Sequence, residues 1–273
     1  MYIGGIMYLC SETELNIEKT FECGQCFRWN RMEDGSYWGI VNGCYAEVSV
    51  EDGKVYITSN APDNLWRYYF DLDTNYEEIS STFTGEYLSK CVEYGKGIRI
   101  LRQESWETLC SFIISQCNNI NRIKAIVERL CEAFGEEKNY NGKTYFAFPS
   151  AERIAELKLD DLTCIRAGYR AEYVIAAARA IVNGDINLEY LKNADFHQAI
   201  KELRTIRGVG EKVANCVVLF GLGHMEAFPI DTWMKHALKA NFPPDFNPET
   251  LGEYAGLAQQ YIFYYARNEG VDK

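Results

Sequence analysis

The spacing of apolar residues changes near Ser81, and this change limits the chain to folds that combine a sheet with helices. Before that point, apolar and polar residues alternate in short runs that turn sequences separate. A period of two predicts strands with one buried face. Strands are expected at residues 26–30, 37–41, 45–50 and 54–58. Because the connecting turns are short, these strands should form an antiparallel meander.

Beyond Ser81 the apolar residues follow helical spacing. Ser105 and Ser150 are expected as helix N-caps, and residues 139–148 as a loop. The predicted fold class is α+β, with an N-terminal antiparallel β-sheet lobe (residues 1–90) followed by a mostly α-helical body (residues 91–273). Helices are expected at residues 105–115, 121–134, 151–157, 169–183, 231–240 and 250–267.

The net charge of −11 argues against binding to nucleic acid, which normally requires a basic surface. The acidic residues are unevenly distributed, however. Residues 1–98 contain 7 Lys+Arg against 16 Asp+Glu, whereas residues 99–240 contain 19 against 18. Residues 241–273 contain 2 against 5. The helical body is thus close to neutral, and a basic groove would have to come from the local placement of its arginines.

Several features bear on the compartment. Residues 1–10 have neither a basic run nor a small-residue cleavage site, so we expect no signal peptide. No run approaches the roughly 20 apolar residues that a membrane helix needs, so we expect no membrane association. The ten cysteines lie without framework spacing, which indicates reduced thiols. Together these features favour a cytoplasmic, prokaryotic protein.

One segment carries candidate chemistry, because Gly208-Val209-Gly210 joins two helical patterns. A glycine turn lets main-chain N–H groups approach a phosphate closely. An ordinary helix–helix turn has the same Gly-x-Gly pattern, so the pattern alone leaves both interpretations open. The flanking apolar residues favour a packed hairpin over residues 203–220; they are Leu203, Ile206, Val213, Val217 and Phe220.

Two charged residues follow the turn: Lys212 lies two residues beyond it, and Asp231 follows Pro229-Ile230. A lysine can act as a nucleophile when burial or a nearby cation favours its neutral form, although most helical lysines are solvated. An aspartate before a helix is also a good N-cap. Its two roles are compatible, because a capped carboxylate stays ionised and rigid, as a catalytic anion must.

Residues 208–216 together with Pro229-Ile230-Asp231 resemble the helix-hairpin-helix (HhH-GPD) DNA glycosylase superfamily. Further segments resemble one branch of it, the 8-oxoguanine DNA glycosylase/lyases; they are residues 23–29, 115–123, 168–173 and 254–260. They occur in the family's order and span nearly the whole chain. The resemblance implies a bifunctional base excision repair enzyme that excises 8-oxoguanine opposite cytosine from duplex DNA. Base flipping and a lysine Schiff base would precede β-elimination.

The resemblance also implies roles for individual residues. Lys212 would attack C1′ of the damaged nucleoside, and Asp231 would stabilise the charge that builds up on the sugar. The Gly24 carbonyl would accept a hydrogen bond from N7–H, which 8-oxoguanine has and guanine lacks. The rest of the damaged-base pocket would be Cys216, Gln259 and Phe263. The hairpin residues Gly208, Val209 and Gly210 would bind a DNA phosphate.

On the opposite strand, the implied contacts to the cytosine and the gap are Asn118, Arg122, Tyr169 and Arg170. The chain departs from the family pattern at two places. Cys117 begins a Cys-Asn-Asn run where many relatives have three asparagines, and Trp233 stands where a histidine is often found. These departures concern the residue that fills the gap and one phosphate contact, and leave the chemistry unaffected.

Cofactors are not expected. The last cysteine, Cys216, precedes Asp231, so the C-terminal iron–sulfur site of some superfamily members is missing. Cys23-x-x-Cys26 has no second pair or histidine cluster at ligand spacing, which argues against a metal site. A structural cation at the hairpin stays open. The expected partner is double-stranded DNA with an oxidised purine, bound by a monomer. The alternatives are an HhH glycosylase for another modified purine and a non-catalytic HhH DNA-binding protein.

Overall fold

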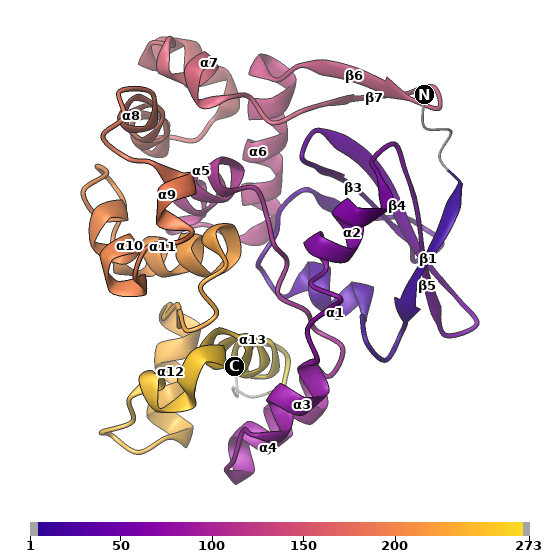
Figure 1. Ribbon diagram of the computed structural model, residues 1–273. Helices are drawn as coiled ribbons and strands as arrows, with labels where there is room; N and C mark the ends of the chain where they lie inside the picture. Colours follow the sequence, from indigo (N-terminus) through magenta and orange to yellow (C-terminus); the bar gives the residue numbers. More distant parts are fainter. Residues whose placement is uncertain (1–4, 270–273) are drawn as a thin grey trace.

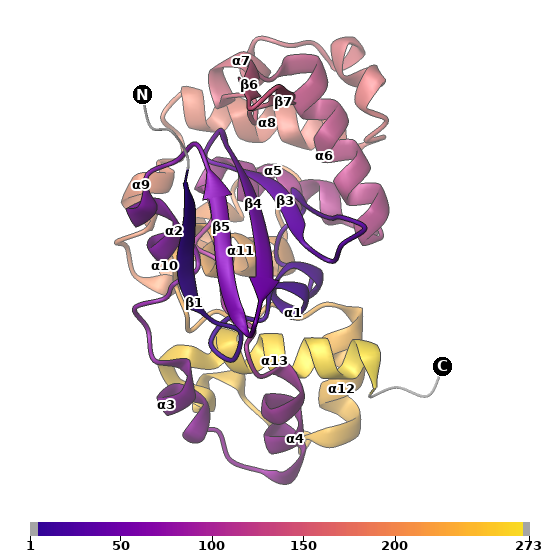
Figure 2. The same ribbon diagram turned by 90° about the vertical axis from the view of Figure 1, so that its right-hand side faces the viewer.

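A computed structural model describes residues 5–269, so residues 1–4 and 270–273 of the two predicted lobes lie outside it. Its N-terminal part is a five-stranded antiparallel sheet of order β1-β5-β4-β3-β2 (Figure 2). The predicted meander is confirmed, and β1 pairs with β5 as an additional edge strand. The strands are β1 (Ile6–Ser11), β2 (Trp29–Arg31), β3 (Tyr37–Val41), β4 (Cys44–Glu51) and β5 (Lys54–Ser59).

The first predicted strand is wrong over residues 26–28, because the segment before Trp29 is held as a loop. Gln25 is completely buried, and its amide donates to the carbonyls of Thr20 (3.0 Å) and Arg99 (2.8 Å). Its Oε1 accepts from the Leu101 N–H at 2.8 Å. These side-chain bonds replace a strand ladder, and they fix the loop that carries Gly24.

Aromatic side chains fill the core of this lobe. The Phe21 ring of α1 (Ile17–Glu22) stacks on Trp29 at 4.3 Å. The Trp29 Nε1–H donates to the hydroxyl of Tyr69, at the end of α2 (Asp63–Tyr69). Two further helices follow, α3 (Tyr76–Ser81) and α4 (Glu86–Gly95), and α4 packs against the C-terminal helix α13 (Ala255–Asn268) (Figure 1). A helix from the first third of the sequence therefore packs against the C-terminal helix.

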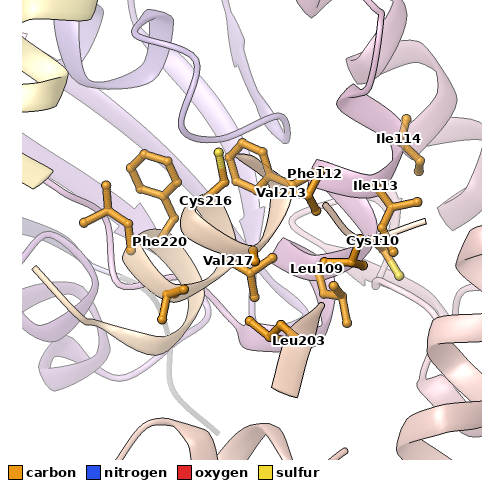
Figure 3. Close-up of a cluster of buried hydrophobic side chains, with 14 of the residues drawn as sticks. Leu109, Cys110, Phe112, Ile113, Ile114, Leu203, Val213, Cys216, Val217 and Phe220 are labelled. Atoms are coloured by element: carbon orange, nitrogen blue, oxygen red, sulfur yellow. The ribbon is translucent and has the colours of Figure 1, made fainter. Parts of the chain in front are cut away.

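The rest of the chain is mainly helical, which confirms the α+β class. Helix α5 is its centre, because most of its residues are buried against α8, α11 and their neighbours (Figure 3). The helices are α5 (Ser105–Ser115), α6 (Ile120–Phe134), α7 (Ala151–Ala155), α8 (Arg170–Val182), α9 (Leu188–Leu191), α10 (Phe196–Leu203), α11 (Glu211–Val217) and α12 (Thr232–Asn241). Shorter turns are the 3₁₀ helices η1 (Leu159–Ile165) and η3 (Pro248–Tyr254) and the π-helical η2 (Val218–Leu222), which continues α11.

The expected loop at residues 139–148 is wrong, because this segment forms most of a hairpin of β6 (Glu137–Tyr140) and β7 (Lys143–Phe146). Asn141 and Gly142 both have positive φ (50° and 78°), as a tight two-residue hairpin turn requires. The hairpin extends from α6 to the sheet lobe (Figure 1). There the Tyr145 hydroxyl donates to the Gly43 carbonyl at 3.3 Å, so the hairpin joins the two parts of the protein.

Helix ends follow local hydrogen bonding. Ser150 caps α7 as expected, but α5 is capped by Glu104, whose carboxylate accepts from two N–H groups. Ser105 instead donates its hydroxyl to the Gly221 carbonyl at 2.8 Å. The last predicted helix is wrong in its first turn, which is the 3₁₀ helix η3 with Gly252 at φ 76°.

Within residues 5–269, no helix is long and apolar enough to cross a membrane.

Candidate active site

The hairpin between α10 and α11 is a tightly packed turn. Gly208 has φ 86°, and a Cβ there would overlap the ring of Tyr173 on α8. The Gly208 carbonyl accepts from the Gln116 side chain at 3.0 Å. Gly210 is the N-cap of α11 and is exposed, with open space where its Cβ would be. The first N–H groups of α11 therefore face solvent with no partner in the helix, as an anion site requires.

Lys212 lies in the first turn of α11 and is half-buried. Its Nζ donates to the Ser115 hydroxyl at 3.3 Å and lies 5.1 Å from the centre of the Phe112 ring. Both contacts come from α5. They hold the half-buried amine beside Phe112, a member of the buried apolar cluster drawn in Figure 3. Sequence reasoning missed both of these residues, since nothing local in the sequence pairs them with Lys212.

Asp231 is the N-cap of α12, as predicted, and its carboxylate accepts from the Met234 N–H at 2.8 Å. The carboxylate is thereby oriented by its own helix. Asp231 is half-buried and lines the same small pocket as Lys212. The predicted helix cap is therefore confirmed, and the capped carboxylate lies at the pocket that Lys212 also lines.

This pocket has a free volume of about 40 Å³, room for only a few waters. A purine could enter only if side chains moved. Gly24 and Phe263 form one side of it: a Cβ at Gly24, whose φ is 79°, would lie 3.4 Å from the Phe263 ring. The ring therefore lies directly against the glycine backbone. The full lining is Cys23, Gly24, Phe112, Lys212, Cys216, Phe220, Pro229, Asp231, Gln259, Gln260 and Phe263.

Cys216 lies one turn beyond Lys212 on α11 and is buried (3% exposed). It lies near the stacked rings of Phe112 and Phe220, whose centres are 5.4 Å apart (Figure 3). Burial raises the pKa of the Cys216 thiol, and Lys212 opposes this only in part. The cysteine is thus a neutral, apolar surface at neutral pH and is poorly suited to act as a nucleophile.

Two of the larger hollows bear on the choice of site. One, of about 940 Å³, lies between the β-lobe and α3–α4 and contains none of the predicted site residues. The other, of about 990 Å³, runs along α10 and α11 to α12 and has Lys212 in its lining. Size therefore does not identify the site, whereas the small pocket combines a lysine, a capped carboxylate and a glycine loop.

The predicted opposite-strand residues gather around the turn between α5 and α6. Arg170 is buried, and its guanidinium donates to the carbonyls of Gln116 (2.7 Å), Cys117 (3.1 Å) and Ala167 (3.2 Å). Cys117 has φ 49°, so the arginine clamps a left-handed turn. The Arg170 guanidinium also lies 4.5 Å from the centre of the exposed Tyr169 ring.

The other two members of this group differ in exposure. Asn118 is half-buried, and its amide donates to the Ile114 carbonyl at 3.2 Å. Arg122 is exposed in the first turn of α6, where Asn119 caps the helix by accepting from the Arg122 N–H. The structure therefore brings Asn118, Tyr169 and Arg170 to one turn and leaves the Arg122 side chain at the surface beside it.

Metal ligation has no support in the geometry. Within residues 5–269, no cluster of three or more His, Cys, Asp and Glu side chains could hold a metal ion. All ten cysteines are free thiols, and burial raises the pKa of Cys23 to about 12. Cys23 and Cys26 are both buried in the loop that carries Gly24, so this pair serves the packing of that loop.

The chain is similar to known protein families over most of its length. The family model for HhH-GPD superfamily base excision DNA repair proteins matches residues 110–250, and the model for the N-terminal domain of 8-oxoguanine DNA glycosylase matches residues 7–109. The chain belongs to the HhH-GPD superfamily. Its branch is that of the 8-oxoguanine DNA glycosylases, and it is a DNA glycosylase with DNA lyase activity.

Solved structures and curated relatives agree with this placement. MBOgg1 in complex with a low affinity DNA ligand is 36% identical over 99% of this chain and 98% of that chain, with a TM-score of 0.90. The Clostridium acetobutylicum 8-oxoguanine glycosylase/lyase, bound to double-stranded DNA with cytosine opposite 8-oxoG, is 37% identical over 98% and 99%, with a TM-score of 0.89. A probable N-glycosylase/DNA lyase of Methanothermobacter thermautotrophicus is 26% identical over 94% of this chain and 95% of its own length.

Proposed function

We propose that this glycosylase excises 8-oxoguanine opposite cytosine from duplex DNA and then cleaves the abasic strand by β-elimination. The observation that carries the proposal is that Lys212, Asp231, Gly24, Gln259 and Phe263 line one pocket although they come from widely separated segments. This set combines a nucleophile, a fixed anion and a base-recognition surface, which glycosylase/lyase chemistry requires.

In the proposed chemistry, the neutral Lys212 amine attacks C1′ of the flipped nucleotide. The N-glycosidic bond breaks as the new C–N bond forms, and its electron pair leaves with the base, which takes up a proton. Loss of a proton and opening of the sugar ring give the Schiff base between Nζ and C1′. Removal of a C2′ proton then expels the 3′-phosphate as the lyase step. The Ser115 and Phe112 contacts orient the amine.

Asp231 acts electrostatically in this proposal. The sugar develops positive charge as the base departs, and a carboxylate held by its own helix stabilises that charge without reorganisation. Its cap bond to the Met234 N–H is the support for this role, because it keeps the carboxylate in place before the substrate binds.

The proposed recognition of the lesion depends on the Gly24 loop and α13. The flipped base enters between Phe263, which stacks on one face, and Cys216, whose neutral thiol packs against the other. The Gly24 carbonyl accepts from N7–H of 8-oxoguanine, whereas the N7 lone pair of guanine would oppose it. Gln259 faces the Watson–Crick edge. The pocket is nearly closed without DNA, so Phe263 has to move away from Gly24.

For the opposite strand, we propose that Arg122 and Arg170 donate to the acceptors of the unpaired cytosine, with Tyr169 as the wedge and Asn118 beside the gap. Arg170 has to exchange some of its bonds to the Gln116–Cys117 turn for bonds to the base, which couples DNA binding to the shape of this turn. The hairpin residues 208–210 hold a phosphate through main-chain N–H groups, with or without a structural cation.

The test is an excision assay on duplexes with 8-oxoguanine, 3-methyladenine or an unmodified guanine, each opposite all four bases. The proposal predicts fast excision of 8-oxoguanine opposite cytosine, followed by strand cleavage at the same site. Preferred excision of another purine would instead support the alternative lesion, and duplex binding with no excision would support a non-catalytic DNA-binding protein. Size-exclusion chromatography with light scattering tests the expectation of a monomer.

A further inference from the structure

The pocket contains a second glutamine that the proposed mechanism leaves unused. Gln260 follows Gln259 on α13, and each side chain is only 3% exposed. They lie in a run of buried residues that is otherwise mainly apolar. Buried amides normally have partners for both the oxygen and the nitrogen. Two consecutive buried glutamines at one pocket therefore need an explanation beyond packing.

Hydrogen bonds fix the orientation of both amides. The Pro229 carbonyl can only accept, so the group that faces it at 3.1 Å must be the Gln259 Nε2–H. The Gln259 Oε1 then points towards Gln260 and accepts from its Nε2–H at 2.8 Å. Flipping either amide would place two donors or two acceptors against each other. The chain of bonds therefore runs from Gln260 through Gln259 to the Pro229 carbonyl.

This chain leaves one atom without a partner. The Gln260 Oε1 is buried and accepts no hydrogen bond. A buried acceptor without a donor lowers stability, and a ligand that supplies the donor gains the corresponding free energy on binding. Gln260 lines the same pocket as Lys212 and Asp231, so the missing donor can come from the base that enters it.

The hydrogen-bonding groups that remain free on the two glutamines match the Watson–Crick edge of a guanine-type base. After its two internal bonds, the Gln259 amide keeps one N–H and one lone pair, which suit O6 and N1–H of the base. The neighbouring exocyclic 2-amino group is a further donor, and it needs a further acceptor. We propose that Gln260 is a specificity residue whose Oε1 accepts from the 2-amino group while its Nε2–H holds Gln259 in register. This inference depends on the proposed excision of 8-oxoguanine.

The discriminating substrate is the 8-oxo analogue of hypoxanthine, which lacks only the 2-amino group. Opposite cytosine, the wild-type enzyme should excise 8-oxoguanine about tenfold faster than this analogue in single-turnover assays. Gln260→Met keeps the chain length but has no polar end. It should slow excision of both bases, because Gln259 loses its positioning bond, and should reduce the tenfold preference to about one.

Two further variants separate positioning from recognition. Gln260→Glu keeps an acceptor oxygen but cannot donate to Gln259, so it should slow both substrates and retain the preference. Tyr261→Phe changes the next residue of α13, which lines the separate hollow beside α3–α4, and should leave the preference unchanged. Melting temperatures of all variants show whether each is folded.

The results separate the two proposals. If the wild type excises 8-oxoguanine and Gln260→Met keeps the full preference for the 2-amino base, the role of Gln260 in recognition is overturned. Equal excision of both bases by the wild type overturns it as well. If the wild type excises neither base, the proposed function itself fails.

Discussion

Substitution of the two hairpin glycines by alanine should have different effects, because their surroundings differ. In Gly208→Ala, the new Cβ would overlap the Tyr173 ring and lie 2.8 Å from its Cδ1 atom. Alanine at the φ of 86° costs about 1–2 kcal/mol, and the overlap about 1–3 kcal/mol more. The free energy of unfolding should therefore fall by about 2–5 kcal/mol, which corresponds to roughly 10 °C in melting temperature.

Gly210→Ala is the matched control for the fold. No atom lies within 4 Å of its added Cβ, and its φ of −94° suits any residue. The free energy of unfolding should fall by only about 0.5–1 kcal/mol, because alanine is a weaker N-cap residue than glycine. The methyl group would, however, stand beside the N–H groups that we propose bind phosphate. Duplex affinity should therefore fall about tenfold, which is about 1.4 kcal/mol.

Urea unfolding measures the first effect, and fluorescence anisotropy with a labelled lesion duplex measures the second. A Gly208→Ala protein as stable as the wild type would show that the turn is not packed against α8 as described. Wild-type duplex affinity in Gly210→Ala would refute the role of the hairpin as a phosphate site.

Three other substitutions test two parts of the site and one buried carboxyl group of α5. Gly24→Ala should lower the free energy of unfolding by about 1 kcal/mol, since the φ of Gly24 is 79°. Its excision rate should fall at least about tenfold, because the methyl group enters the base pocket, and a wild-type excision rate would contradict this. Asp231→Asn keeps an N-capping side chain, so its melting temperature should stay within about 2 °C while excision falls about 100-fold; unchanged excision would remove the electrostatic role. Burial raises the pKa of Glu107 to about 7, so the folded state binds the proton more tightly than the unfolded chain and stability is lost as pH rises through this range. The free energy of unfolding of Glu107→Gln should therefore exceed that of the wild type by about 1–2 kcal/mol near pH 8 and equal it near pH 4. A difference that does not depend on pH would contradict the raised pKa of Glu107.

The fold was largely predictable where a local pattern dominates. Strands β3, β4 and β5 lie close to the positions that alternation predicts, and Asp231 and Ser150 cap helices as expected. The errors arose where side chains from distant segments decide the structure. Gln25 binds the backbone of residues 99–101 and removes its loop from the predicted strand. The β6–β7 hairpin is different, because its turn sequence Asn141-Gly142 is a local signal that predicts a hairpin.

The candidate site was predictable in its members but not in their contacts. The family motifs identify Lys212, Asp231 and Gly24, and the structure places all three on one pocket. The sequence could not indicate that Arg170 uses its guanidinium to hold the Gln116–Cys117 turn, because that pairing spans more than fifty residues. It also could not indicate which of the glutamines on α13 keeps an unpaired acceptor, since that depends on the Pro229 carbonyl.

Borohydride trapping tests the central claim most directly, because it captures the Schiff base between the enzyme and the abasic sugar. The wild type should form a covalent adduct with an 8-oxoguanine:cytosine duplex, and peptide mapping should locate the adduct at Lys212. Lys212→Gln should form none, whereas Lys235→Gln, which removes an exposed lysine of α12, should trap like the wild type. Trapping that persists in Lys212→Gln would contradict the assignment of this lysine as the nucleophile.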